Sequence, residues 1–232
     1  MERFSRVKSL IGEESLKKLN NSKVAVFGCG GVGGYAIEGL VRSGVGSITV
    51  FDNDKVSLSN INRQIIATEK TVGVLKTDAI ISRAKEINPN IKITGVNAFY
   101  MPENADEYPL SEFDFIIDAI DTVTAKIELI RRAKESFVPI ISSMGTGGKT
   151  DVSRLKIVDI SKTHDCPLAK VMRLELKKRN IVDIPVVFSD EKRSGETFTE
   201  NGRHAPSSMI FVPAVAGLMM ADFVVKKLIG KE

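Results

Sequence analysis

Cysteine is scarce in this sequence of 232 residues, which contains two, Cys29 and Cys166. The two lie far apart and no C-x-x-C pair occurs, so the chain offers no ligand set for a structural zinc ion. Two free cysteines are typical of a protein in a reducing compartment. We therefore expect a cytoplasmic protein that does not depend on zinc for its fold.

Long apolar runs are also missing. The most apolar stretch, residues 209–225, is interrupted by Pro213, Gly217 and an aspartate, and a spanning helix needs about 20 apolar residues. Residues 1–10 are charged and lack the apolar segment of a secretion signal. We predict no clear membrane span, and we interpret residues 213–229 as a buried or subunit-packing helix.

Neither sign of charge dominates, because 33 Lys and Arg oppose 29 Asp and Glu for a net charge of +4. This balance mildly favours an anionic partner such as nucleic acid, but on charge alone we prefer ordinary solubility as its explanation. Two segments gather positive charge: Arg131, Arg132 and Lys134 in one, and Lys170, Arg173, Lys177, Lys178 and Arg179 in the other. Either could bind RNA phosphates or be a solvated helix face. No interleaved aromatic residues indicate base stacking.

What the sequence does contain is an alternation of short apolar runs with amphipathic segments. Strands are predicted at residues 23–27, 47–51, 91–96, 113–117 and 138–142, and helices at residues 35–42, 73–87 and 125–137. Strands that alternate with helices form parallel sheets with crossover helices. The sequence predicts an α/β fold, a Rossmann-like doubly wound, mostly parallel sheet with helices on both faces.

Three segments are expected within one overall domain. Residues 1–22 form an N-terminal helical arm, residues 23–150 a nucleotide-binding core, and residues 151–232 a C-terminal extension. The extension contains strands at 154–160 and 184–189, a basic helix at 168–179, a mobile polar loop at 190–206 and the final helix.

A glycine-rich motif follows the first predicted strand. Gly28, Gly30 and Gly33 match G-x-G-x-x-G, and Gly31 and Gly34 add to it. Placed between a strand and a helix, the motif lets phosphate oxygens meet backbone N–H groups at the helix N-terminus. Asp52 closes the second strand, where a carboxylate can bond ribose hydroxyls. The motif alone does not separate NAD from ATP, and tight strand–helix packing is the alternative explanation.

The segment after Asp52 favours ATP. Arg63 and Lys76 would place two cations near the phosphates, where hydride transfer has no use for them but phosphoanhydride cleavage does. Asp118 and Asp121 follow the fourth strand, where a carboxylate can hold Mg²⁺. For either cation alone, a solvated surface side chain would be the better explanation, but the ordered set argues against it.

The strings GCGGVGG, FDNDKVSLSNINRQ, VGVLKTDA and DAIDT resemble the nucleotide site of the ubiquitin-activating-enzyme superfamily of adenylating enzymes, which includes the ThiF and MoeB types. Within it the chain resembles the tRNA threonylcarbamoyladenosine dehydratases. The N-terminal arm and residues 159–179 are similar to that branch, and the four zinc-binding cysteines of many carrier-activating members are missing. Cys166 interrupts the D-P-L-A string of the branch, which departs from its pattern.

The resemblance implies an activity and a set of roles. The activity is ATP-dependent cyclisation of threonylcarbamoyladenosine beside the tRNA anticodon, through a carboxyl-adenylate, with ATP and Mg²⁺ bound and Asp121 as metal ligand. The nucleotide-binding residues implied are Gly28, Gly30, Gly31, Gly33, Asp52, Asp54, Ser59, Asn60, Asn62, Arg63, Lys76, Asp121 and Thr122. Arg63, Lys76 and Asp121 also take part in catalysis.

A homodimer is implied as well, in which an arginine of the arm reaches the partner's ATP. Arg6 aligns best with that arginine and Arg3 second, while a plain surface arginine is the alternative for Arg6. The expected partners are tRNA and, as a further candidate, a sulfur-transfer protein, but not DNA.

Two other functions stay open. The first is adenylation of a sulfur-carrier protein with Cys166 as acceptor, although we prefer a small buried filler as its role. The second is an NAD-binding module. Cys29 is interpreted as a packing residue, and His164 and His204 as structural or surface residues.

Overall fold

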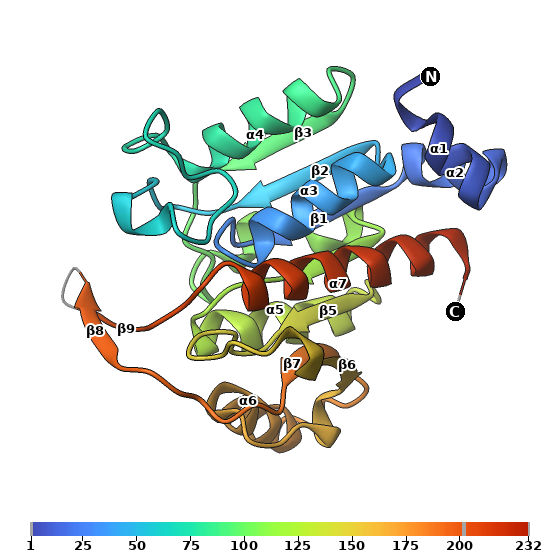
Figure 1. The fold of residues 1–232 in the computed structure, drawn as a ribbon. Helices are drawn as coiled ribbons and strands as arrows, with labels where there is room; N and C mark the ends of the chain where they lie inside the picture. Colours follow the sequence, from blue (N-terminus) through green and yellow to red (C-terminus); the bar gives the residue numbers. More distant parts are fainter. Residues whose placement is uncertain (1, 201–202, 232) are drawn as a thin grey trace.

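The computed structural model describes residues 2–200 and 203–231, and only the backbone of residues 198–200 and 203–205. Its centre is a seven-stranded sheet with the order β3-β2-β1-β4-β5-β7-β6 (Figure 1). The strands are β1 (Lys23–Phe27), β2 (Ser47–Phe51), β3 (Lys92–Val96), β4 (Phe115–Asp118), β5 (Ile140–Ser143), β6 (Leu155–Asp159) and β7 (Pro185–Ser189). All neighbours pair in parallel except β6, which runs antiparallel to β7. The predicted mostly parallel sheet is confirmed.

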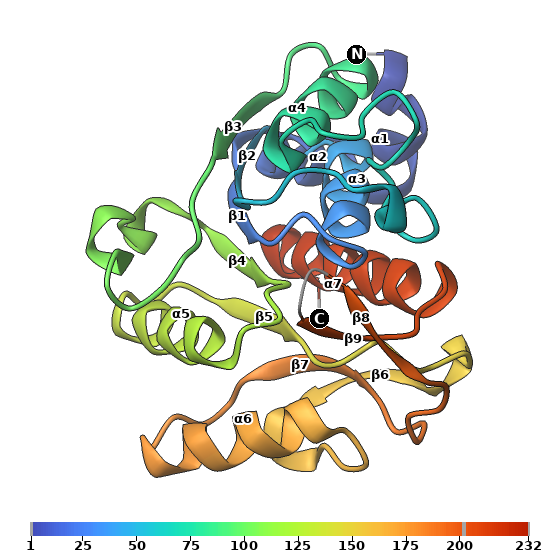
Figure 2. The ribbon, with the colours of Figure 1, turned by 90° about the vertical axis from the view of Figure 1, so that its left-hand side faces the viewer.

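Helices cover both faces of this sheet (Figure 2). On one face lie α3 (Gly33–Ser43), α4 (Lys76–Ile87) and α7 (Phe211–Ile229); on the other lie α5 (Val123–Glu135) and α6 (Pro167–Lys178). Side chains alternate between the faces of a strand, so Val24 and Val26 of β1 join the core beneath α3 and α7, whereas Ala25 and Phe27 join the core beneath α5. The apolar run of β1 is therefore buried on both sides.

The order of the strands creates a switch point between β1 and β4. From β1 the chain passes through α3 to β2 and through α4 to β3, all on one side of β1. It then returns to form β4 on the other side of β1. In open α/β sheets, ligands bind outside the carboxyl ends of the strands at such a point. The glycine motif follows β1 and the DAIDT string spans the end of β4, so both lie there.

The helical arm is not continuous. A 3-10 turn (Glu2–Phe4) leads into α1 (Ser5–Ile11) and α2 (Glu13–Asn21), which Gly12 separates with a φ of 88°. The arm packs beside the amino ends of the strands, where the Gly46 N–H donates to the Leu19 carbonyl and the Ser47 N–H to Ser22. It therefore lies at the opposite end of the sheet from the switch point (Figure 1).

Two local predictions need correction. The helix predicted from residue 73 begins at Lys76, because Gly73 has a φ of 86° and Leu75 forms a β-bridge with Lys55. The loop predicted at 190–206 contains an antiparallel hairpin of β8 (Thr197–Glu200) and β9 (Arg203–Pro206). Residues 201–202 of that loop, and the side chain of His204, lie outside the described part of the chain.

The last helix packs closely on the helix that follows the glycine motif. A Cβ on Gly217 of α7 would lie 2.2 Å from the Val32 carbonyl oxygen, and a Cβ on Gly39 of α3 would lie 2.7 Å from Cβ of Ala221. Both contacts are closer than any larger side chain allows. The buried-helix interpretation of residues 213–229 is confirmed, and no helix among the described residues is long and apolar enough to cross a membrane.

We expect Gly217→Val to lower the free energy of unfolding by about 3 kcal/mol, because the new side chain overpacks the contact between α3 and α7. Denaturant unfolding measures this change. Lys226→Ala, on the exposed side of the same helix, is the control and should cost about 0.5 kcal/mol or less. Equal effects of the two substitutions would contradict this description of the helix contact.

Candidate nucleotide-binding site

The glycines of the motif serve two different purposes. Gly28 has a φ of 93°, and its Cβ would lie 2.7 Å from the Ala119 carbonyl oxygen; a Cβ on Gly33 would lie 1.8 Å from the Gly28 carbonyl oxygen. These two glycines allow α3 to start directly above the end of β1. At Gly30 and Gly31 the nearest atoms would lie at 4.0 and 3.4 Å, which leaves room for a Cβ. Internal packing therefore explains Gly28 and Gly33 but not Gly30 and Gly31.

The backbone of this loop presents unused hydrogen-bond donors. Within the described part of the chain, no acceptor pairs with the N–H groups of Gly30, Gly31, Val32 and Gly33. They lie at the N-terminus of α3, where the helix dipole adds partial positive charge. Such a cluster of N–H groups binds phosphate and other anions.

Asp52 holds the backbone of the glycine loop in place through its carboxylate. Its carboxylate accepts hydrogen bonds from the Cys29 N–H at 2.7 Å and the Asp54 N–H at 2.9 Å. Burial raises the pKa of Asp52, while the Lys76 ammonium and these two N–H donors oppose the rise. Burial, followed by the charge of Asp52, also raises the pKa of the Cys29 thiol well above its usual value. Cys29 is thus a buried packing residue with little thiolate character.

Lys76 is held inside the site as the first residue of α4. Its ammonium donates to Asp54 at 2.7 Å and lies 3.9 Å from Asp52, and the residue is 7 % exposed. The Lys76 N–H donates to the Asp54 carbonyl, which ties the start of α4 to the segment that follows β2. A lysine paired in this way carries its charge to the site without a solvated side chain.

The predicted turn after β2 lies against the glycine loop. The 3-10 turn Leu58–Asn60 is closed by Asn60, whose side-chain oxygen accepts from the Ser57 N–H at 3.2 Å. The Ser59 hydroxyl lies 2.9 Å from that of Ser57, and Arg63 donates to the Ser59 carbonyl at 2.8 Å. These bonds fix a rigid turn rather than a flexible loop.

Arg63 and Asn62 connect this turn to its surroundings. Arg63 donates to the Asn62 side chain at 2.9 Å, and its Cγ would lie 3.5 Å from a Cβ on Gly31. Asn62 donates to the Ser208 carbonyl at 2.8 Å, just before α7. The aliphatic part of the Arg63 side chain therefore lies beside the glycine loop, while its guanidinium is bonded within the turn.

The two aspartates of the DAIDT string differ in environment. Asp118 is fully buried: its Oδ2 lies 2.8 Å from Nζ of Lys126, which is also fully buried, and accepts from the Ser142 hydroxyl at 2.6 Å. Asp121 is exposed, and among the described residues its carboxylate is bonded only to Thr122, whose hydroxyl donates to it at 3.3 Å. Asp118 is thus a structural anchor, and the carboxylate free to meet a ligand is that of Asp121.

A single carboxylate is a sufficient protein ligand for Mg²⁺ when phosphates and water supply the rest. Among the described residues no group of three metal-binding side chains occurs. The donor set therefore fits a metal that arrives with a nucleotide rather than one held by the protein alone.

The structure brings most of the predicted residues to the carboxyl ends of β1, β2 and β4, but not the arginines of the arm. Arg6 is exposed on α1, at the other end of the sheet (Figure 1). Arg3 donates to the Asn88 side chain at 3.0 Å, beside the end of α4. Neither can reach the glycine loop of its own chain.

Two residues of the site were missed in the sequence analysis. Lys126 lies inside the apolar face of a predicted helix, where its position among Ala125, Leu129 and Ala133 could have marked it as buried. Gln64 directly follows Arg63 in the turn, and its burial depends on long-range packing that no local pattern reveals.

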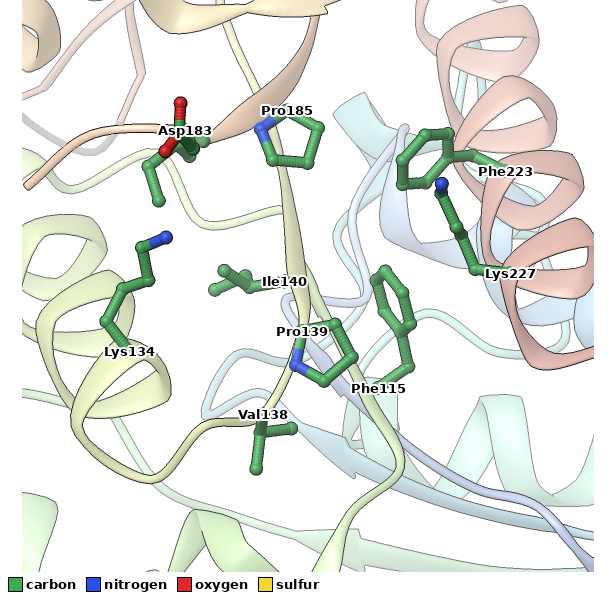
Figure 3. A pocket seen from close by; sticks show the side chains of 10 residues that line it. Phe115, Lys134, Val138, Pro139, Ile140, Asp183, Pro185, Phe223 and Lys227 are labelled. Atoms are coloured by element: carbon green, nitrogen blue, oxygen red, sulfur yellow. The ribbon is translucent and has the colours of Figure 1, made fainter. Parts of the chain in front are cut away.

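A separate hollow of about 240 Å³ lies at the amino ends of β4, β5 and β7 (Figure 3). Phe115, Ile140 and Phe223 are among its apolar lining residues, and Lys134 and Lys227 are among the polar ones, with the Lys227 ammonium 5.6 Å from the centre of the Phe223 ring. It lies at the opposite end of the sheet from the glycine loop, and none of the predicted site residues lines it.

A nucleotide-binding loop with two cations and a free carboxylate defines a protein of the adenylating class, and the chain belongs to the ThiF family, whose sequence pattern matches residues 4–232. It is 43 % identical over 242 residues to the tRNA threonylcarbamoyladenosine dehydratase of Bacillus subtilis, covering 99 % of this chain and 95 % of that protein. The resemblance inferred from the motifs is confirmed.

Solved structures agree with this assignment. The ATP complex of the Escherichia coli dehydratase TcdA superposes with a TM-score of 0.89 at 32 % identity, covering 99 % of this chain and 94 % of that one. The molybdopterin-synthase adenylyltransferase of Haemophilus influenzae is 35 % identical over 126 residues, which is 54 % of this chain and 51 % of that protein. The similarity to the dehydratases extends over almost the whole chain.

We predict that Lys126→Ala lowers the free energy of unfolding by about 4 kcal/mol, because it leaves the Asp118 carboxylate buried without its cation. Denaturant unfolding is the measurement. The control is Lys134→Ala, an exposed lysine of the same helix, with an expected loss of about 0.5 kcal/mol or less. A loss below about 1 kcal/mol for Lys126→Ala would show that the buried pair of Lys126 and Asp118 does not stabilise the end of β4.

Proposed function

We propose that this protein is an ATP-dependent dehydratase that cyclises threonylcarbamoyladenosine in tRNA through a carboxyl-adenylate. The observation that carries the proposal is the set of unpaired N–H groups at residues 30–33. The Arg63 side chain packs beside Gly31, and Lys76 lies 3.9 Å from the Asp52 carboxylate that bonds the loop at Cys29. The proposal is supported by the similarity to the Bacillus subtilis dehydratase along 99 % of the chain.

The residues of the site divide the work of adenylation. The N–H groups of residues 30–33 bind phosphate oxygens, and Asp52 receives the ribose hydroxyls. Lys76 and Arg63 stabilise the negative charge that shifts as the substrate carboxylate displaces pyrophosphate. The Asp54 carboxylate, which pairs with Lys76, orients the ammonium, and Asn60 and Ser59 hold the turn that carries Arg63.

The second half of the reaction requires little from the protein. Activation replaces hydroxide, a poor leaving group, by AMP. The carbamoyl group then closes the ring within the same molecule, so correct orientation supplies much of the rate acceleration. No protein nucleophile is needed.

Asp121 is the residue that would hold Mg²⁺, with Thr122 at the start of α5 bonded to it. The metal would neutralise charge on the phosphates. The Asp121 carboxylate is exposed and makes no ion pair among the described residues, so it is available to a metal–nucleotide complex.

Cys166 does not have the exposure of an acceptor cysteine. It is 4 % exposed, and its sulfur would lie 3.6 Å from a Cβ on Gly145. This burial favours the role of a packing residue and disfavours sulfur-carrier adenylation with Cys166 as acceptor.

For the N-terminal arm we retain the expectation that one of its arginines reaches the ATP of a partner subunit. Arg6 is exposed at the far end of the sheet from its own site, so it acts only if a second copy brings its arm to this one. We propose a homodimer on that basis. A sulfur-transfer partner protein stays a proposal that no feature described above favours.

Of the two basic helices, α6 is the better candidate for the tRNA contact. On α5, Arg131 and Arg132 are compensated by ion pairs with Glu128, Glu135 and Asp106. Lys134 alone of that set is exposed without an ion pair among the described residues. On α6, Lys170 and Lys177 are exposed and form no ion pair with another described residue. Unpaired lysines at a surface attract phosphates.

The direct test of the proposed function is incubation of the protein with ATP, Mg²⁺ and tRNA that carries the threonylcarbamoyl mark. The expected products are the cyclised nucleoside, AMP and pyrophosphate, detected by mass spectrometry and nucleotide chromatography. A nucleoside of unchanged mass, or pyrophosphate exchange that requires a small protein ending in Gly-Gly, would overturn the proposal in favour of carrier adenylation. Tighter binding of NADH than of ATP would favour the NAD-binding alternative.

For Asp121→Asn we expect kcat/KM to fall by about 100-fold or more, because metal-assisted charge stabilisation is lost. Stability should change by about 0.5 kcal/mol or less, since the carboxylate is exposed. The control is Asp222→Asn, an exposed aspartate on α7 that pairs with Lys226. If Asp121→Asn retains full turnover, Asp121 is not the metal ligand.

The double variant Lys170→Glu/Lys177→Glu should raise the KM for tRNA roughly tenfold and weaken its salt dependence, because two phosphate contacts are reversed. The KM for ATP should stay the same. Lys85→Glu/Lys92→Glu changes the net charge equally at exposed positions on α4 and β3, at the opposite edge of the sheet. If both double variants weaken tRNA binding equally, net charge rather than α6 is responsible.

A further inference from the structure

A second loop at the carboxyl ends of the strands also presents unused hydrogen-bond donors. It follows β5, and within the described part of the chain no acceptor pairs with the N–H groups of Gly145, Thr146 and Gly147. All three residues are partly exposed. A ligand can therefore reach these donors, which the fold itself does not use.

Hydrogen bonds on both sides hold this loop in place. Before the unpaired donors, the Met144 N–H donates to the Val187 carbonyl at 2.8 Å. After them, the Gly148 N–H donates to the Ser207 carbonyl, and the Gly148 carbonyl accepts from the Ser194 N–H, both at 2.7 Å. The loop is thus tied to β7 and to the segment between β7 and α7, and its free donors are set in position before a ligand binds.

Lys149 ends the loop as a buried cation without a counter-charge. It is 3 % exposed, its ammonium donates to the Ser189 carbonyl at 2.6 Å, and it makes no ion pair with another described residue. Burial lowers the pKa of Lys149, and its acidic neighbours Cys166, Glu191 and Asp190 oppose the shift without cancelling it. Because a buried charge is costly unless it is paired, this site favours the approach of an anion.

The acidic neighbours of Lys149 serve other partners. Asp190 pairs with Arg154 and Lys156, each at 2.6 Å. Glu191 accepts the backbone N–H groups of the two residues that follow Lys149. By contrast, each of the other two buried lysines in the described chain pairs with an aspartate at 2.8 Å or less. The positive charge of Lys149 is therefore uncompensated within the described chain.

The register of the sheet places this loop beside the candidate nucleotide site. One row of paired residues crosses β1, β4 and β5: Phe27, Asp118 and Ser142. The donors of residues 30–33, the carboxylate of Asp121 and the donors of residues 145–147 all begin three positions beyond this row. Neighbouring strands are about 4.8 Å apart, so the segment with Asp121 leaves the sheet between two loops of unpaired N–H groups.

Formation of a carboxyl-adenylate brings two anions together, the triphosphate and the substrate carboxylate. They repel each other, so the carboxylate needs positive charge and donors of its own. The donors of residues 30–33 lie on one side of Asp121 and suit the phosphates. Those of residues 145–147 lie on its other side and are available to the second anion.

We propose that the N–H groups of residues 145–147, with the buried charge of Lys149 behind them, bind the carboxylate of the threonylcarbamoyl group. Lys149 is a positioning residue, because it acts on the carboxylate through its field and not by contact. The inference rests on the proposed dehydratase function, and it assigns the part of the site that receives the second substrate.

The test compares tRNA that carries the threonylcarbamoyl mark with the same tRNA without the mark. Each is titrated against protein loaded with a non-hydrolysable ATP analogue, and fluorescence anisotropy measures the affinity. Lys149→Met keeps the length of the side chain and removes its charge, so marked tRNA should bind about tenfold more weakly. Unmarked tRNA should bind as before. Urea unfolding should occur at the same or a higher concentration, because an unpaired buried charge is removed.

Lys192→Met is the matched control. Lys192 is an exposed lysine three residues after β7 that forms no ion pair with another described residue, so the control removes the same charge without touching the loop. It should leave the preference for marked tRNA unchanged.

Amide hydrogen exchange of the unaltered protein tests the loop without any substitution. The amides of residues 145–147 should be protected by marked tRNA, but not by unmarked tRNA or by the ATP analogue alone.

Two results would overturn the inference while leaving the proposed function intact: cyclisation of the mark without protection of residues 145–147, or a full preference for marked tRNA in Lys149→Met. An equal loss of affinity for both tRNAs in Lys149→Met would also overturn it, and would assign the loop to RNA phosphates. If the unaltered protein neither prefers nor cyclises marked tRNA, the proposed function itself is wrong.

Discussion

The site depends on one close contact, between the first turn of α3 and the end of β1. A Cβ on Gly33 would lie 1.8 Å from the Gly28 carbonyl oxygen, so no other residue allows the helix to start there. That contact aims the N–H groups of residues 30–33 past the end of the sheet, and it leaves them unpaired. Packing therefore determines the conformation of the loop, and the unpaired N–H groups of the loop then form a site for an anion.

Other interactions hold this arrangement on three sides. The carboxylate of Asp52 bonds the Cys29 N–H beneath the loop, and α7 presses on α3 through Gly217. The buried pair of Asp118 and Lys126 fixes the strand end opposite. These contacts are internal to the chain, so the donors of the loop and the cations around it are set in place before any ligand binds. Such preorganisation is the main source of electrostatic stabilisation in enzymes.

The sheet, most of its strands and the nucleotide motif could be predicted from the sequence because they are encoded locally, by apolar runs of strand length and by glycine spacing. The burial of Asp118 and the exposure of Asp121 could not, since the two lie only three positions apart in the sequence and the tertiary fold alone buries one of them. The start of α4 was misplaced by three residues, because the β-bridge of Leu75 with Lys55 overrides a helical pattern. The hairpin after β7 was missed because its sequence is polar. The environments of Gln64 and Lys126 are likewise products of long-range packing.

The central claim is that the N–H groups of residues 30–33 bind the phosphates of ATP. Amide hydrogen exchange, followed residue by residue with and without a non-hydrolysable ATP analogue, tests it most directly. The account predicts that these four amides exchange quickly in the free protein and are strongly protected when the analogue is bound. Unchanged exchange at residues 30–33, with protection appearing elsewhere in the protein, would contradict it.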